Sequence, residues 1–171
     1  MSQKHIIVEP EKGRYHDVLL DCPVIFINTA IYRAWHERLY RIFGTGAATI
    51  LFEMGRGQGE DAVKILKNKL NNLNSISLGL EHAFYLGWGN FKVSKAQLLK
   101  MAVLKSLTIK VENGFIPRAV GDREEAACHF LRGFFVGAYE TYTGEKCSCE
   151  ETKCMAKGDP FCEFQLKKEA K

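Results

Sequence analysis

The spacing of hydrophobic and polar residues predicts four helices. Apolar residues recur every three to four positions over residues 29–43, 46–71 and 75–86, as on the buried face of an amphipathic helix. A fourth pattern runs over residues 122–144 and begins with a candidate capping box at Asp122 and Glu125. Helices therefore account for much of the chain.

Glycines interrupt the second of these helical patterns at three positions, Gly55, Gly57 and Gly59. Each glycine in a helix interior costs about 1 kcal/mol relative to alanine. Their presence predicts either a kink or a close contact between this helix and another one.

Shorter β-rich runs predict strands near both ends of the chain. Turn residues such as Pro10, Pro23 and the pair Asn113–Gly114 separate them. A last turn at residues 157–160 predicts a hairpin between the final two strands. The expected strands cover residues 5–9, 18–20, 24–27, 91–93, 107–111, 116–120, 147–154 and 161–166.

Composition indicates an ordinary globular chain. The 171 residues suit one domain, with 46% hydrophobic and 26% charged residues. The longest uncharged runs are shorter than the ~20 apolar residues that cross a bilayer, and the N-terminus lacks a signal-peptide pattern. We therefore expect no membrane span and a cytoplasmic location. A net charge of only +4 argues against nucleic-acid binding.

Nucleotide and nucleophile motifs carry little weight here. The stretch from Gly44 to Thr49 looks like a dinucleotide fingerprint, but a predicted helix precedes it where a strand is required. The five histidines lie in unrelated contexts and form no evident catalytic pair. The sequence therefore advertises no catalytic residues.

Six cysteines are unusual in a cytosolic chain of this size, and four of them lie within residues 147–162. Such a cluster is typical of a metal or redox site rather than a disulfide framework. Cys154 and Cys162 flank the predicted turn, Glu151 lies three residues before Cys154, and Cys128 is the natural fourth ligand. Thiolates with a carboxylate suit a structural zinc ion.

Two alternatives remain open for the cysteines. The Cys-x-Cys pair Cys147 and Cys149 places both thiols on one face of a strand and rivals the four proposed ligands. The cysteines could also be small buried residues that hold no metal.

Several motifs resemble those of the 4-vinyl reductase domain family. The most specific is the C-terminal segment from Gly144 to Phe164, in which Glu-x-x-Cys is followed after seven residues by another Cys. Leu51–Gly59, Leu86–Phe91, Val111–Phe115 and Cys128–Gly133 are similar to earlier motifs of the family, in consistent order. The resemblance is strongest to the aromatic-sensing N-terminal domain of phenol-type transcriptional activators.

This resemblance implies an α+β fold, an antiparallel sheet with helices packed against it, related to TRAPP vesicle-tethering subunits. It divides the chain into an N-terminal arm (1–23), the ligand-binding domain (24–166) and a frayed tail (167–171). It implies zinc ligands at Cys128, Glu151, Cys154 and Cys162, and a homodimer. Its functional implication is a stand-alone sensor for a small hydrophobic or aromatic molecule.

Aromatic residues of the segment 75–88 and of the helix 122–142 are candidates to line the ligand cavity, although ordinary core packing explains them equally well. His82 and Trp88 would be the polar groups that orient a ligand. The candidate ligand-binding residues are His82, Phe84, Tyr85, Trp88, Phe134, Phe135 and Tyr139, with Phe130 adding aromatic surface. The competing functions are a TRAPP-like interaction scaffold and an accessory subunit of a tetrapyrrole or hydrocarbon enzyme.

Overall fold

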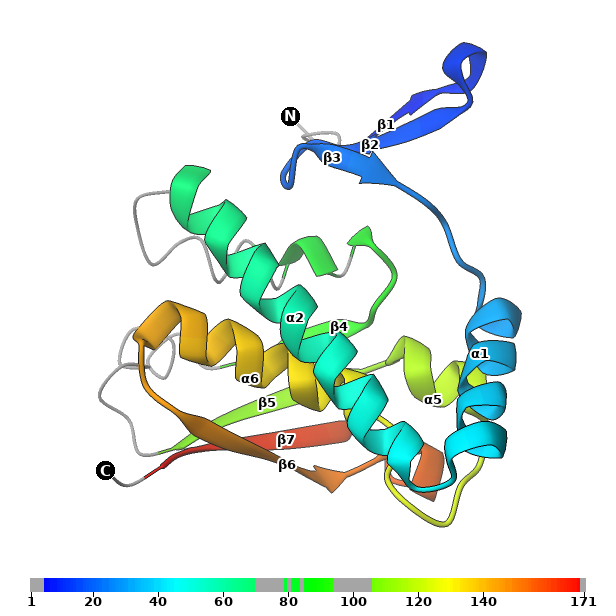
Figure 1. The fold of residues 1–171 in the computed structure, drawn as a ribbon, viewed down its shortest axis with the longest axis vertical. Coiled ribbons are helices and arrows are strands. Elements are labelled where there is room, and N and C mark those ends of the chain that lie inside the picture. The colour runs from blue at the N-terminus through cyan, green and yellow to red at the C-terminus, as the bar shows by residue number, and fades with distance from the viewer. Residues whose placement is uncertain (1–4, 70–78, 80, 84, 94–105, 170–171) are drawn as a thin grey trace.

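The computed structural model describes residues 5–69, 79, 81–83, 85–93 and 106–169. Within them, a four-stranded sheet is covered on one face by helix α6 (His129–Thr143), and α2 (Gly46–Lys69) crosses α6 on the side away from the sheet (Figure 1). The expected helix over 75–86 and the segment 94–105 lie largely outside the described residues.

The sheet consists of β4 (Asn90–Lys92), β5 (Ser106–Glu112), β7 (Cys162–Lys168) and β6 (Cys147–Lys153), in that order, with every neighbouring pair antiparallel. Its inner face alternates with its outer face along each strand, as the pleat requires. On β5 the buried residues are Leu107, Ile109 and Val111, which pack against α6 and β7. The predicted α+β fold with an antiparallel sheet is confirmed.

Helices α2 and α6 approach unusually closely because glycines lie where they cross. A Cβ atom on Gly55 would stand 1.9 Å from the carbonyl oxygen of Phe130, and one on Gly133 would stand 1.8 Å from that of Phe52. Gly59 and Gly137 make equivalent contacts, so α2 continues without interruption through its glycines. Of the two predicted alternatives, close helix contact is therefore the correct one.

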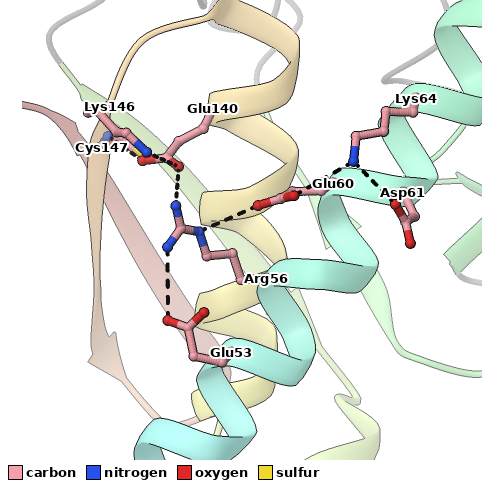
Figure 2. A network of polar contacts seen from close by, with 8 residues as sticks. All are labelled: Glu53, Arg56, Glu60, Asp61, Lys64, Glu140, Lys146 and Cys147. Atoms are coloured by element: carbon pink, nitrogen blue, oxygen red, sulfur yellow. Dashed lines mark hydrogen bonds and ion pairs between the residues drawn. The ribbon is translucent and has the colours of Figure 1, made fainter.

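A network of ion pairs borders this crossing (Figure 2). Arg56 of α2 donates to Glu140 of α6 at 2.9 Å and lies within 3.9 Å of Glu53 and 3.6 Å of Glu60. Glu140 also accepts hydrogen bonds from Lys146 at 3.1 Å and from the backbone N–H of Cys147 at 3.4 Å. The network therefore joins α2, α6 and the start of β6.

Helix α1 (Thr29–Phe43) begins as predicted, with the Asn28 side chain accepting a hydrogen bond from the backbone N–H of Ile31. Its apolar stripe is not covered: Trp35 is 52% exposed and Ile42 is 67% exposed. The buried residue of α1 is His36. The apolar pattern thus predicted the helix correctly but not what it faces.

Three local predictions are wrong. Residues 116–120 form a short helix, α5 (Phe115–Val120), because Pro117 lacks the N–H that a sheet needs but fits a first helical turn. Asp122 and Glu125 do not open α6, which begins at His129, since the backbone N–H of Arg123 bonds instead to Ala156. Residues 18–20 form a turn rather than a strand.

The N-terminal residues form a separate antiparallel sheet in the order β1 (Ile6–Glu9), β2 (Arg14–Asp17) and β3 (Cys22–Val24). A short 3₁₀ turn, η1 (Pro10–Lys12), joins the first two strands. The extended residues 25–28 connect this sheet to α1 (Figure 1). In the described part of the chain, no helix is long and apolar enough to cross a membrane.

Candidate metal centre and apolar cavity

Four predicted metal ligands converge at one end of the four-stranded sheet. Cys128 immediately precedes α6, Glu151 lies on β6, Cys154 precedes the 3₁₀ turn η2 (Met155–Lys157), and Cys162 opens β7. Their ligand atoms all lie within 4.8 Å of one another. A shift in the β6–β7 register between Glu151 and Lys153 accompanies this arrangement.

The cluster is enclosed and partly pre-oriented. The Sγ atoms of Cys128 and Cys162 lie 3.7 Å apart, and Glu151 Oε2 accepts a hydrogen bond from the backbone N–H of Cys128 at 3.0 Å. The backbone N–H of Met155 points at Cys162 Sγ, at 3.3 Å. Glu151 Oε1 is buried and has no hydrogen-bond partner among the residues described. An orphaned carboxylate oxygen beside three thiols is free to bind a cation.

Burial makes negative charge costly at this cluster. It raises the pKa of Glu151 to about 8, with further repulsion from Cys154. Hydrogen bonds with Cys154 and Cys162, together with burial, raise the pKa of Cys128 well above its ordinary value. A divalent cation would reverse this cost because its charge favours the ionised ligands. The donor set could therefore hold a metal ion.

Cys147 and Cys149 lie outside the cluster, although they share a strand face with Glu151. A strand rises ~3.3 Å per residue, which places Cys149 ~7 Å and Cys147 ~13 Å along β6 from Glu151. Both thiols are buried against the core, and burial raises the pKa of each to about 12. The structure thus groups Cys128, rather than this pair, with the other ligands.

An apolar cavity of about 110 Å³ lies between α2, α6 and the sheet. Predicted ligand residues that line it are His82, Trp88, Phe134, Phe135 and Tyr139. The remaining lining residues were not predicted, and those of α2 and the sheet had been expected only as core. They include Ala62, Val63, Leu66, Leu107, Ile109 and Leu166, together with Leu19 and Leu20.

The other aromatic candidates lie elsewhere. Tyr85 is 47% exposed and stacks on His5 with ring centroids 3.6 Å apart. Phe84 lies outside the described residues. Phe130 contacts Trp88 at 5.7 Å and lines a second groove rather than the cavity. The cavity therefore contains part of the predicted set.

His82 faces protein groups on both ring nitrogens. Nε2 lies 2.6 Å from Asp17 Oδ2, and Nδ1 lies 3.4 Å from His5 Nδ1. Both Asp17 and His82 are buried. Sequence reasoning missed Asp17, because nothing in the chain indicates that residues 65 positions apart are paired.

Comparisons with known proteins agree with this architecture. Residues 107–168 match the family model of the 4-vinyl reductase domain. An uncharacterized protein of Methanocaldococcus jannaschii, MJ0150, is 30% identical over 128 residues, which are 75% of this chain and 69% of that protein.

Two solved structures extend the comparison to nearly the whole fold. The phenol-responsive sensory domain of the transcription activator PoxR, solved with phenol, has a TM-score of 0.79 at 16% identity, covering 96% of this chain and 85% of that one. A trafficking protein particle complex subunit 3 from Naegleria fowleri, covalently bound to palmitic acid, has a TM-score of 0.60 at 16% identity, covering 83% and 95%. The matched sheet and α6, the relative and the shared fold agree with the resemblance described above, and the chain belongs to the 4-vinyl reductase domain family.

Proposed function

We propose that this protein is a sensor domain that binds a small hydrophobic or aromatic molecule in the cavity between α2 and α6 and is stabilised by one structural zinc ion. The observation that carries the proposal is the cavity itself. Its walls are aliphatic and aromatic, and its residues come from four different parts of the fold.

The size of the cavity favours a ligand with one ring. An engineered apolar cavity of ~150 Å³ in another protein stays dry and admits benzene. The cavity here measures about 110 Å³ and is bordered by Trp88, Phe134 and Phe135, whose ring contacts are mostly edge-on. Such walls suit a flat apolar molecule. The phenol bound by the PoxR sensory domain is a ligand of this class.

The four clustered residues suit zinc as the bound metal. Tetrahedral ligands ~2.3 Å from a zinc ion lie ~3.8 Å from one another, and the Sγ atoms of Cys128 and Cys162 are 3.7 Å apart. Three thiolates and the free oxygen of Glu151 would complete four ligands. Zinc would supply structural stability by tying α6 to the β6–β7 hairpin.

A binding screen tests the ligand proposal. Phenol, toluene, a fatty acid and a tetrapyrrole are titrated by calorimetry into the wild type and into Ala62→Leu, which fills the cavity from α2. We expect a single-ring compound to bind the wild type and to lose at least about tenfold in affinity in the variant. Trp35→Ala, which changes an exposed side chain away from the cavity, is the control. Binding that is equal in Ala62→Leu and the wild type would contradict the proposal.

A second function, protein association, is favoured by the apolar surface of α1 and its neighbours. We propose that a second copy of the chain covers this surface in a homodimer. A typical interface buries ~800 Å² on each partner, an area that a patch of several large side chains can supply. The exposed residues are Ile25, Phe26, Ile27, Ile31, Trp35, Ile42, Phe43 and Met54.

Light scattering tests this association. The wild type should have the mass of a dimer, and Ile42→Glu should have that of a monomer, because one charge on each copy would meet its twin near the centre of an apolar face. Val8→Glu, an exposed apolar residue of the N-terminal sheet, is the control. A monomeric wild type at 100-fold the screening concentration would contradict the homodimer.

A further inference from the structure

The N-terminal sheet is attached to the rest of the protein in an unusual way. Among residues 5–28, Asp17 is the only one that is buried, at 1% exposure. The apolar side chains of this sheet, such as Ile7, Val8 and Val18, are 43–54% exposed. The sheet therefore has no apolar core of its own, and its anchor is a carboxylate.

Both oxygens of Asp17 are engaged. Oδ2 lies 2.6 Å from His82 Nε2, and Oδ1 accepts hydrogen bonds from the backbone N–H groups of Leu19 and Leu20, each at 2.9 Å. The side chain that shapes the turn after β2 is thus the same one that binds His82. Any movement of His82 away from Asp17 releases the turn from the wall of the cavity.

The turn also closes the cavity. Leu19 and Leu20 line it opposite α2 and α6, and His82 lines it from the segment that carries Trp88. His5 adds a second contact on the same side, since its ring stacks on Tyr85 and its Nδ1 faces His82. Beyond this contact, the extended residues 25–28 tether the sheet to α1 (Figure 1).

We propose that the N-terminal sheet is a cap on the ligand cavity, and that the contact between Asp17 and His82 is the latch that must open for a ligand to enter or leave. The proposal rests on the proposed function for its ligand. A bound ligand would add apolar contacts with Leu19 and Leu20 in the closed state only, so occupancy would hold the cap shut.

The latch can form and break as a unit. Separating a buried ion pair leaves two poorly solvated groups, which keeps the closed state well defined. Once the pair is broken, few buried apolar contacts resist further opening, because the side chains of the sheet are already largely exposed. Ligand binding would thereby be read out as order or disorder of the N-terminal sheet.

Hydrogen exchange of the Leu19 and Leu20 amides tests the latch without any ligand. In Asp17→Asn the side chain offers one acceptor oxygen where the carboxylate offers two, so we expect both amides to exchange at least about tenfold faster than in the wild type. The matched control is Asp21→Asn, which removes a carboxylate paired with His16 at 3.0 Å but exposed on the same sheet. Amides of β5 should be unchanged in both variants. Unchanged exchange at Leu19 and Leu20 in Asp17→Asn would overturn the proposal.

Binding kinetics then test whether the cap gates the cavity, with phenol and toluene as probes. Asp17→Asn should raise the association and dissociation rates together, by about tenfold each, since opening limits both. Asp21→Asn should leave both rates as they are. A change confined to dissociation would make Asp17 an affinity residue rather than a latch and would overturn the gate, as would unchanged rates. If neither probe binds the wild type, the proposed function fails, and the exchange experiment alone decides whether Asp17 holds the cap.

Discussion

Replacing Gly55 by alanine should destabilise the protein by about 3 kcal/mol, the upper end of the cost of overpacking. The new Cβ would lie 1.9 Å from the carbonyl oxygen of Phe130 and 2.8 Å from its carbon. Ordinary contact needs more than 3 Å, so the backbones of α2 and α6 would have to separate by more than 1 Å along a densely packed crossing. Both colliding groups are backbone, so a change of side-chain rotamer cannot relieve the clash.

Gly57→Ala provides the matched comparison in the same helix. A Cβ at Gly57 meets nothing within 4 Å, so this change should stabilise the protein by about 0.5–1 kcal/mol through the better helix propensity of alanine. Urea unfolding at constant zinc and reductant, followed by far-UV circular dichroism, gives both free energies of unfolding. If the two variants shift stability in the same direction, the close crossing of α2 and α6 is wrong.

Three further predictions concern single side chains. Cys162→Ser should lose the bound zinc and several degrees of melting temperature, whereas Cys149→Ser should keep a stoichiometric ion by elemental analysis. Burial lowers the pKa of His36 to about 4, so the unfolded chain binds more protons below pH 6.5 and stability should fall as the pH drops. His36→Gln should remove up to about 2 kcal/mol of the loss between pH 7 and pH 5, and an unchanged slope would contradict this. Arg56→Met should cost about 1–2 kcal/mol, because Glu140 is only 13% exposed, whereas the exposed Lys64→Met should cost less than ~0.5 kcal/mol in the same urea assay.

The sequence predicted best those features that depend on short spacing. The β6–β7 hairpin and the positions of Glu151, Cys154 and Cys162 follow from a turn and a few intervening residues. The helices α1 and α2 follow from periodicity alone. Residues 116–120 failed because three of the four flanking Pro117 are apolar, a pattern that suits a buried strand and a short buried helix equally.

Features that depend on tertiary contact could not be predicted in the same way. The partner of Asp17 lies 65 residues away, and no periodic pattern links a turn of the N-terminal sheet to His82. The apolar stripe of α1 predicted a covered face, yet the structure leaves Trp35 exposed. The glycines of α2 indicated a close contact, but only the position of α6 shows that Gly55 and Gly59 make it while Gly57 does not.

The placement of the two tryptophans gives this protein a built-in pair of optical probes. Trp88 borders the cavity and is surrounded by Phe115, Phe130 and Phe134, whereas Trp35 is half-exposed on α1. Their emission should therefore differ in wavelength and in access to a soluble quencher such as iodide. The blue, shielded component would report events in the cavity and the red, quenchable component would report events on the surface of α1, so occupancy and association can be followed separately in one unlabelled sample.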